Sequence, residues 1–212
     1  MKKIVLFVLI VLPYILFAQE EDTKIENNEI KNSEGFSFKP QFYFYANHHI
    51  NHGNNFLSDG HDASFVGLGL QLNLLKFQKF KFGLGWEYHN YDVINPGTIG
   101  NIDNTFHTSI FGRFQYQWDL SNRWSLEPYV GIGATKIQQK YDDSDSDSFY
   151  GMNLYVGFNI IFKLIDHISF FTGFNYNNIR FNVNTNKNWE DYFNKINQTQ
   201  IQLGIIVSIG KN

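Results

Sequence analysis

The sequence predicts an all-β fold, an eight-stranded antiparallel up-and-down transmembrane β-barrel. Apolar and polar residues alternate through most of residues 36–209, as in strands with one apolar face. The polar positions hold Gly, Asn, Gln, Ser and Tyr, with few Lys or Glu. Such a face suits a crowded barrel interior, with the apolar face turned to lipid.

Composition supports a single exported domain. The chain has 212 residues, and its 17% charged content lies below the roughly 25% of typical soluble domains. It has no cysteine, which excludes disulfides, thiol chemistry and a lipid-modified N-terminal cysteine. The net charge of −3 does not indicate a nucleic-acid-binding surface.

Three regions are expected along the chain. Residues 1–19 are predicted to form a signal peptide, with Lys2 and Lys3 before an apolar run and Ala18 before the cut. The alternative is a membrane anchor, but the run is shorter than the ~20 residues that span a bilayer. Residues 20–35 are acidic and Asn-rich, which predicts a flexible periplasmic lead-in. Residues 36–212 form the barrel domain.

The predicted strands are separated by alternating long and short connections. We expect strands at 36–47, 63–75, 79–91, 105–118, 123–137, 149–163, 167–181 and 198–210. The long connections are 48–62, 92–104, 138–148 and 182–197, and the short ones are 76–78, 119–122 and 164–166. Long loops at one end and tight turns at the other are typical of outer-membrane barrels, whose termini lie in the periplasm.

Aromatic side chains gather near the predicted strand ends. Aromatic rings favour the boundary between lipid and water, so two girdles are predicted. The alternative is the ordinary β-propensity of aromatic residues. The proposed girdle residues are Trp118 and Trp124 on the periplasmic side, and Trp86, Tyr88, Tyr150 and Tyr176 on the outer side.

Over residues 36–210, the alternation, strand count and loop asymmetry resemble the small OmpA/OmpX-like outer-membrane barrels. The chain looks closest to the outer membrane protein β-barrel domain family of Bacteroidota, although it ends SIGKN and lacks the frequent C-terminal aromatic residue. The resemblance implies a monomer in the cell outer membrane. It also implies contact with outer-membrane lipid and lipopolysaccharide, and with the barrel-assembly machinery during biogenesis.

Charged residues on the inward face predict a lumen ion pair. Placing Trp118 opposite Trp124 brings Arg113 near Glu127, with Glu87 closer to the outer mouth. Buried charges need partners because an unpaired one costs several kcal/mol, on the order of 3–5. The pair could brace a plugged barrel, gate a narrow pore or act as an acid/base pair.

The first long connection concentrates four histidines. Neutral imidazoles of His48, His49, His52 and His61 could bind zinc, copper or nickel. Their spacing matches no strong metal motif, so an exposed polar loop is the alternative.

The third long connection carries Asp143, Asp145 and Asp147 at the spacing of a calcium loop. Ser148 replaces the expected glycine and Leu154 the expected glutamate, so a solvated acidic loop is favoured.

Helical spacing recurs in the fourth long connection. Trp189, Tyr192 and Phe193 would share one face of a short helix, with Asn188 as its cap. The face could pack on the barrel rim or dock a surface protein partner.

We expect no enzyme and no cofactor, but a filled barrel with a structural, envelope or surface-binding role carried by its long loops. A narrow passive pore is the alternative. A lipid-A-modifying enzyme is a second alternative, although its candidate residues His89, His107 and Ser109 face inward. A soluble lipocalin-like barrel is disfavoured by the uncharged polar face.

Overall fold

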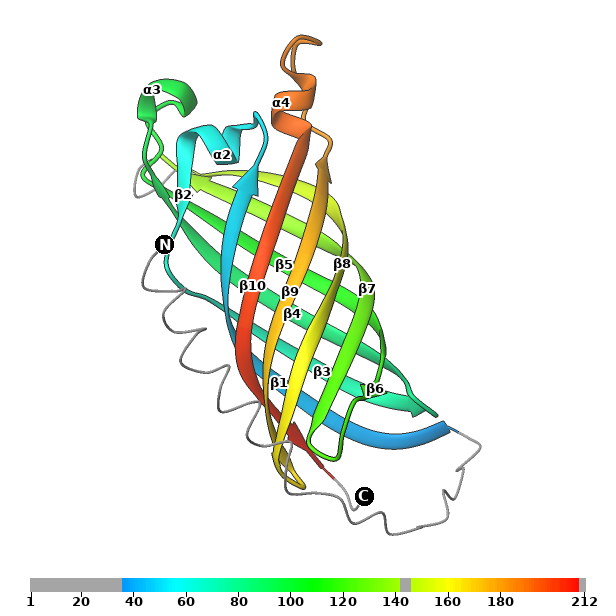
Figure 1. Ribbon diagram of the computed structural model, residues 1–212. Helices are drawn as coiled ribbons and strands as arrows, with labels where there is room; N and C mark the ends of the chain where they lie inside the picture. The colour runs from blue at the N-terminus through cyan, green and yellow to red at the C-terminus, as the bar shows by residue number, and fades with distance from the viewer. Residues whose placement is uncertain (1–35, 142–145, 210–212) are drawn as a thin grey trace. The chain divides into compact units, whose positions relative to one another are not determined.

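A computed structural model describes residues 36–141 and 146–209 (Figure 1). The predicted signal peptide and lead-in lie outside the described residues. Within the described ranges, eight long strands alternate with short elements. The long strands are β1 (Phe36–His52), β3 (Gly67–Phe77), β4 (Phe80–Val93), β5 (Asn104–Tyr116), β7 (Trp124–Lys140), β8 (Ser146–Ile165), β9 (Ile168–Phe181) and β10 (Lys195–Ser208).

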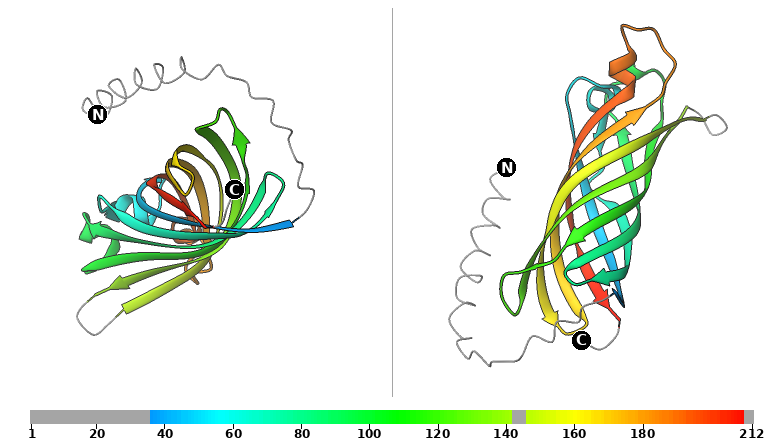
Figure 2. Two further views of the ribbon diagram at one scale, coloured as in Figure 1. Left: turned by 90° about the horizontal axis from the view of Figure 1, so that it is seen from below. Right: turned by 90° about the vertical axis from the view of Figure 1, so that its right-hand side faces the viewer.

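The long strands form one closed antiparallel barrel. Each pairs with the next long strand along the chain, and β1 pairs with β10, for example Phe44 with Ile205, to close the ring. Figure 2 shows the strands curling around a common axis. The predicted fold class of an eight-stranded up-and-down barrel is confirmed.

The two ends of the barrel differ. The short elements α2 (Phe56–Gly60), β2 (His61–Ala63), α3 (Pro96–Ile99) and α4 (Glu190–Asn194) lie at the end with long connections (Figure 1). Tight turns and the two-residue strand β6 (Trp118–Asp119) lie at the other, short-turn end. Among the described residues, none of the helices is long and apolar enough to cross a bilayer.

Alternation along each strand separates an inner from an outer face. On β1, Tyr43 and Tyr45 are 1% and 5% exposed inside the barrel, whereas the intervening Phe44 is 44% exposed. The same pattern on the other long strands leaves a broad outer surface of Phe, Leu, Ile, Val and Trp exposed.

Several strands run further than predicted at the long-connection end. β1 continues to His52, which pairs with Asn197 of β10. β8 begins at Ser146, which pairs with Lys140. Backbone pairing therefore continues through part of each predicted loop, where the side chains no longer show a clean apolar face.

Glycines on the inner face make room for large side chains. A Cβ on Gly69 would overlap the ring of Tyr45, lying 2.8 Å from its Cδ2 atom. At Gly157, a Cβ would overlap the backbone oxygen of Phe174 and lie 2.6 Å from Cβ of Asn175. Neighbouring strands therefore pass too close for any side chain at Gly157.

Gly157→Ala is expected to destabilise the barrel by about 1–3 kcal/mol, because the backbone of β9 must move to admit the methyl group. Gly112→Ala is the matched control, since a Cβ there would make only ordinary contacts, with the ring of Phe82 at 3.6 Å and with Leu84 at 3.9 Å. Unfolding of the purified variants in urea, monitored by their gel mobility without boiling, measures the stability of each variant. Equal unfolding midpoints for the two variants would contradict the close-packing argument.

Candidate functional site

A buried ion pair lies in the half of the lumen nearer the short-turn end. Lys81 donates to Glu127, and the two side chains are 4% and 0% exposed. Glu127 also accepts hydrogen bonds from the Tyr43 hydroxyl at 3.0 Å and from Gln115 at 3.3 Å. These contacts replace water around a carboxylate that would otherwise be costly to bury.

This arrangement corrects the predicted pairing of Arg113 with Glu127. The register between β5 and β7 sets Gln115 opposite Tyr129, and β6 sets Trp118 opposite Leu126, two residues from the predicted alignment. The pairing of β6 with β7 extends the hairpin between β5 and β7. Glu127 therefore lies further from Arg113 than predicted and close to Lys81.

Arg113 instead lies among aromatic rings. Its guanidinium carbon is 4.1 Å from the centre of the Tyr129 ring and 4.9 Å from that of Phe111, which gives cation–π contacts. Glu87 accepts from Tyr45 at 2.6 Å and from Gln202 at 3.1 Å, as a second buried carboxylate.

The buried charged side chains of the described residues balance. They comprise two cations and two carboxylates, namely Lys81, Arg113, Glu87 and Glu127. The fully buried part of the lumen therefore carries no net charge.

Imidazole rings gather further towards the long-connection end. The rings of His49 and His89 stack with centroids 4.2 Å apart, and His107 meets His49 edge-on at 5.3 Å. Nδ1 of His49 lies 2.7 Å from the Tyr91 hydroxyl. Alternation places one histidine inward on each of β1, β4 and β5, and the ring of strands brings them together.

The four histidines of the predicted metal site are separated in the structure. His49 belongs to the buried imidazole cluster, whereas His52 is exposed and bonds Thr199 at 2.8 Å. His61 lies 2.7 Å from the Thr105 hydroxyl, and His48 lies near Phe65. Across residues 36–141 and 146–209, no group of three or more His, Cys, Asp or Glu side chains is placed to hold a metal ion.

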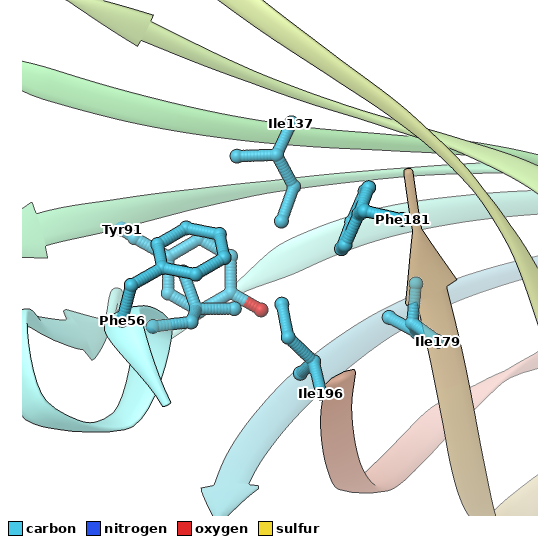
Figure 3. Packing of buried hydrophobic residues seen from close by; sticks show 7 residues of the cluster. Phe56, Tyr91, Ile137, Ile179, Phe181 and Ile196 are labelled. Atoms are coloured by element: carbon cyan, nitrogen blue, oxygen red, sulfur yellow. The ribbon is translucent and has the colours of Figure 1, made fainter. Parts of the chain in front are cut away.

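An apolar cluster is buried inside the barrel at the long-connection end. Figure 3 shows side chains from α2, β4, β7, β9 and β10 converging there. The buried members are Phe56, Leu57, Tyr91, Ile137, Ile179, Phe181 and Ile196. Helix α2 brings Phe56 and Leu57 into the mouth, and the Asn55 side chain caps it by accepting from Leu57 and Ser58.

Helix α4 packs partly against this cluster. The ring of Phe193 stacks on Phe56 with centroids 5.8 Å apart, and Tyr192 packs beside it, whereas Trp189 is 55% exposed. The helix begins after Trp189, which makes no side-chain cap, so the predicted capping by Asn188 is wrong.

The remaining predicted sites fall on the outer surface or outside the described residues. All six proposed girdle residues are at least partly exposed: Trp86, Tyr88, Trp118, Trp124, Tyr150 and Tyr176. Their role at a lipid boundary stays a prediction.

Asp143 and Asp145 of the acidic loop lie outside the described residues, whereas Asp147 accepts from the Tyr141 hydroxyl at 2.9 Å. Burial and this contact raise the pKa of Tyr141 to about 12.

The inward residues considered for catalysis are not arranged as a nucleophile and base. Ser109 accepts from Asn153 at 3.0 Å and from Thr135 at 3.4 Å, and it is 1% exposed.

The sequence reasoning missed α2 and the imidazole cluster. Asn55 three residues before Ser58 was the available capping signal.

The comparisons with known proteins support the fold alone. No family model matches the sequence, and no curated protein does. The crystal structure of Neisserial surface protein A is similar over 83% of this chain and all of that chain, with TM-score 0.61 and 13% identity. A major outer membrane protein from Thermus thermophilus is similar over 80% of this chain and 99% of that chain, with TM-score 0.55 and 11% identity.

Glu127→Gln is expected to cost about 3–5 kcal/mol, because it leaves the Lys81 ammonium buried without a carboxylate. Lys163→Gln is the control, since its 2.8 Å pair with Asp166 is exposed and is worth under about 1 kcal/mol. Equilibrium unfolding in urea measures the free energy of unfolding of both variants. A Glu127→Gln variant as stable as Lys163→Gln would refute the structural role of the buried pair.

Acid is expected to loosen α2 through His61. Burial lowers the pKa of His61, partly offset by its hydrogen bond to the Phe56 carbonyl. Unfolding of the segment therefore takes up a proton, so its opening free energy falls as pH drops below about 6.5. Amide exchange in α2, compared between pH 7.5 and 5, should show this trend more weakly in His61→Gln. The same pH dependence in both proteins would exclude His61 as its source.

Proposed function

We propose that the chain is a small outer-membrane barrel with a closed lumen, whose role is carried by the surface at its long-connection end. The buried apolar cluster in the lumen mouth, which we interpret as a seal, is the observation that carries the proposal. Seven buried apolar side chains fill that mouth, and the layers below them consist of buried polar and aromatic side chains. Membership of the barrel-domain family of Bacteroidota stays a prediction.

The outer surface supports insertion in a membrane. Large apolar side chains on every long strand are exposed, including Leu154 at 62% and Leu203 at 68%. A soluble monomer rarely exposes so much contiguous apolar surface, whereas lipid covers it without cost. The similarity in fold to outer-membrane barrels agrees with this placement.

The long-connection end supports a surface-binding or envelope role. Three connections each present one strongly exposed apolar side chain: Phe65 at 87%, Ile94 at 60% and Trp189 at 55%. Ile94 and Trp189 lie beyond the ends of the paired strands, where lipid would not cover them, whereas Phe65 lies between β2 and β3 beside His48. Lipopolysaccharide or a surface protein is the kind of partner that such side chains suit, and the barrel itself serves as a monomeric scaffold.

The wild-type protein, refolded and inserted in a planar bilayer, is expected to show no discrete conductance steps. The same preparation should migrate faster on a gel before boiling than after it, which reports a folded barrel. A Phe56→Ser, Leu57→Ser variant, which weakens the seal, is recorded beside the wild type to test whether the apolar cluster holds the lumen mouth closed.

Regular steps from the wild type would overturn the closed-lumen proposal and favour the narrow pore. Silence from a preparation that lacks the mobility shift would only report failed folding, so the gel accompanies every recording. An altered lipid A in cells expressing the protein would favour the enzyme alternative.

A further inference from the structure

A polar cavity opens at the short-turn end of the lumen, opposite the apolar seal. Its volume is about 420 Å³, within the roughly 300–1,000 Å³ of ligand pockets. The lining includes five cationic side chains, Lys39, Lys76, Lys81, Arg123 and Lys163. We propose that this cavity binds a phosphate-bearing anion.

Positive charge exceeds negative charge around the cavity. Three carboxylates also line it, and each already has a cationic partner. Glu127 pairs with Lys81, Asp166 pairs with Lys163, and Asp119 lies 3.6 Å from Lys79, which is outside the lining. The lining therefore carries two more positive than negative charges, and its carboxylates are already paired with cations when an anion enters.

The arrangement of donors suits a phosphate group. The five cations come from β1, β3, β4, β8 and the turn before β7, so they approach from different sides of the ring. Phosphate oxygens point in several directions and accept from separate donors, whereas a lone carboxylate offers one edge. Ser121 accepts from the backbone N–H of Trp124 at 3.1 Å, which leaves its own hydroxyl hydrogen to donate.

Two cations at the opening can be changed without disturbing the barrel. Lys39 and Arg123 are exposed, and neither takes part in an ion pair of the described residues. The Lys81–Glu127 pair is buried and braces the barrel, so it is left intact in the test. Lys187, exposed in the fourth long connection, lies outside the lining and takes part in no ion pair of the described residues, so it provides a control loss of charge.

The test is calorimetric titration of sodium pyrophosphate into the full protein in an uncharged maltoside detergent. The wild type should bind saturably, and Lys39→Gln, Arg123→Gln should weaken binding at least about tenfold, the effect of losing charge-assisted hydrogen bonds. Lys187→Gln should bind as the wild type does. Each variant must show the gel shift of a folded barrel.

The absence of saturable wild-type binding, equal weakening by Lys187→Gln, or equal binding of acetate would each overturn the proposal. A second arm identifies the source of the phosphate. If nanodiscs of phosphatidylglycerol abolish pyrophosphate binding while those of phosphatidylcholine do not, an anionic lipid headgroup occupies the cavity. If binding persists in both, the ligand is a free phosphorylated solute.

Discussion

Closure of eight strands into a ring sets the width of the interior, and the rest of the structure depends on that width. So narrow a lumen is filled by side chains, and a large residue fits only where its neighbour is small. The ring of Tyr45 lies against Gly69, and that of Tyr155 against Gly131. The same crowding leaves the side chains of Lys81 and Glu127 only 4% and 0% exposed, so they satisfy each other and their neighbours within the barrel.

The strand faces and the order of the strands could be predicted from sequence, whereas the residue register between paired strands could not. Alternation depends only on the parity of each residue, so His89, His107 and Ser109 were correctly placed inside. A register error of two residues keeps every side chain on its face but changes its cross-strand neighbour. That error occurred between β5 and β7, and it exchanged Arg113 for Lys81 as the partner of Glu127.

Proximity along the chain was a poor guide to the histidines. His48 and His49 are adjacent, yet only His49 is fully buried in the lumen. His49 instead meets His89 and His107, which lie on other strands far along the chain but share its height in the ring. Grouping the inward-facing residues by their strand height, that is, their position along the barrel axis, would have found this cluster, whereas grouping them by loop did not. Strand height requires the register, which alternation alone does not supply.

The two ends of the lumen present different chemistry, and packing explains only one of them. The apolar cluster at the long-connection end buries Phe56 and Leu57, which stabilises α2 directly. At the other end, the buried charges already balance, so Lys39 and Arg123 are not needed to neutralise the interior. Exposed cations placed close together repel one another and add little stability. Their concentration around one cavity therefore has a physical explanation if an anion binds there, and none in the packing of the barrel.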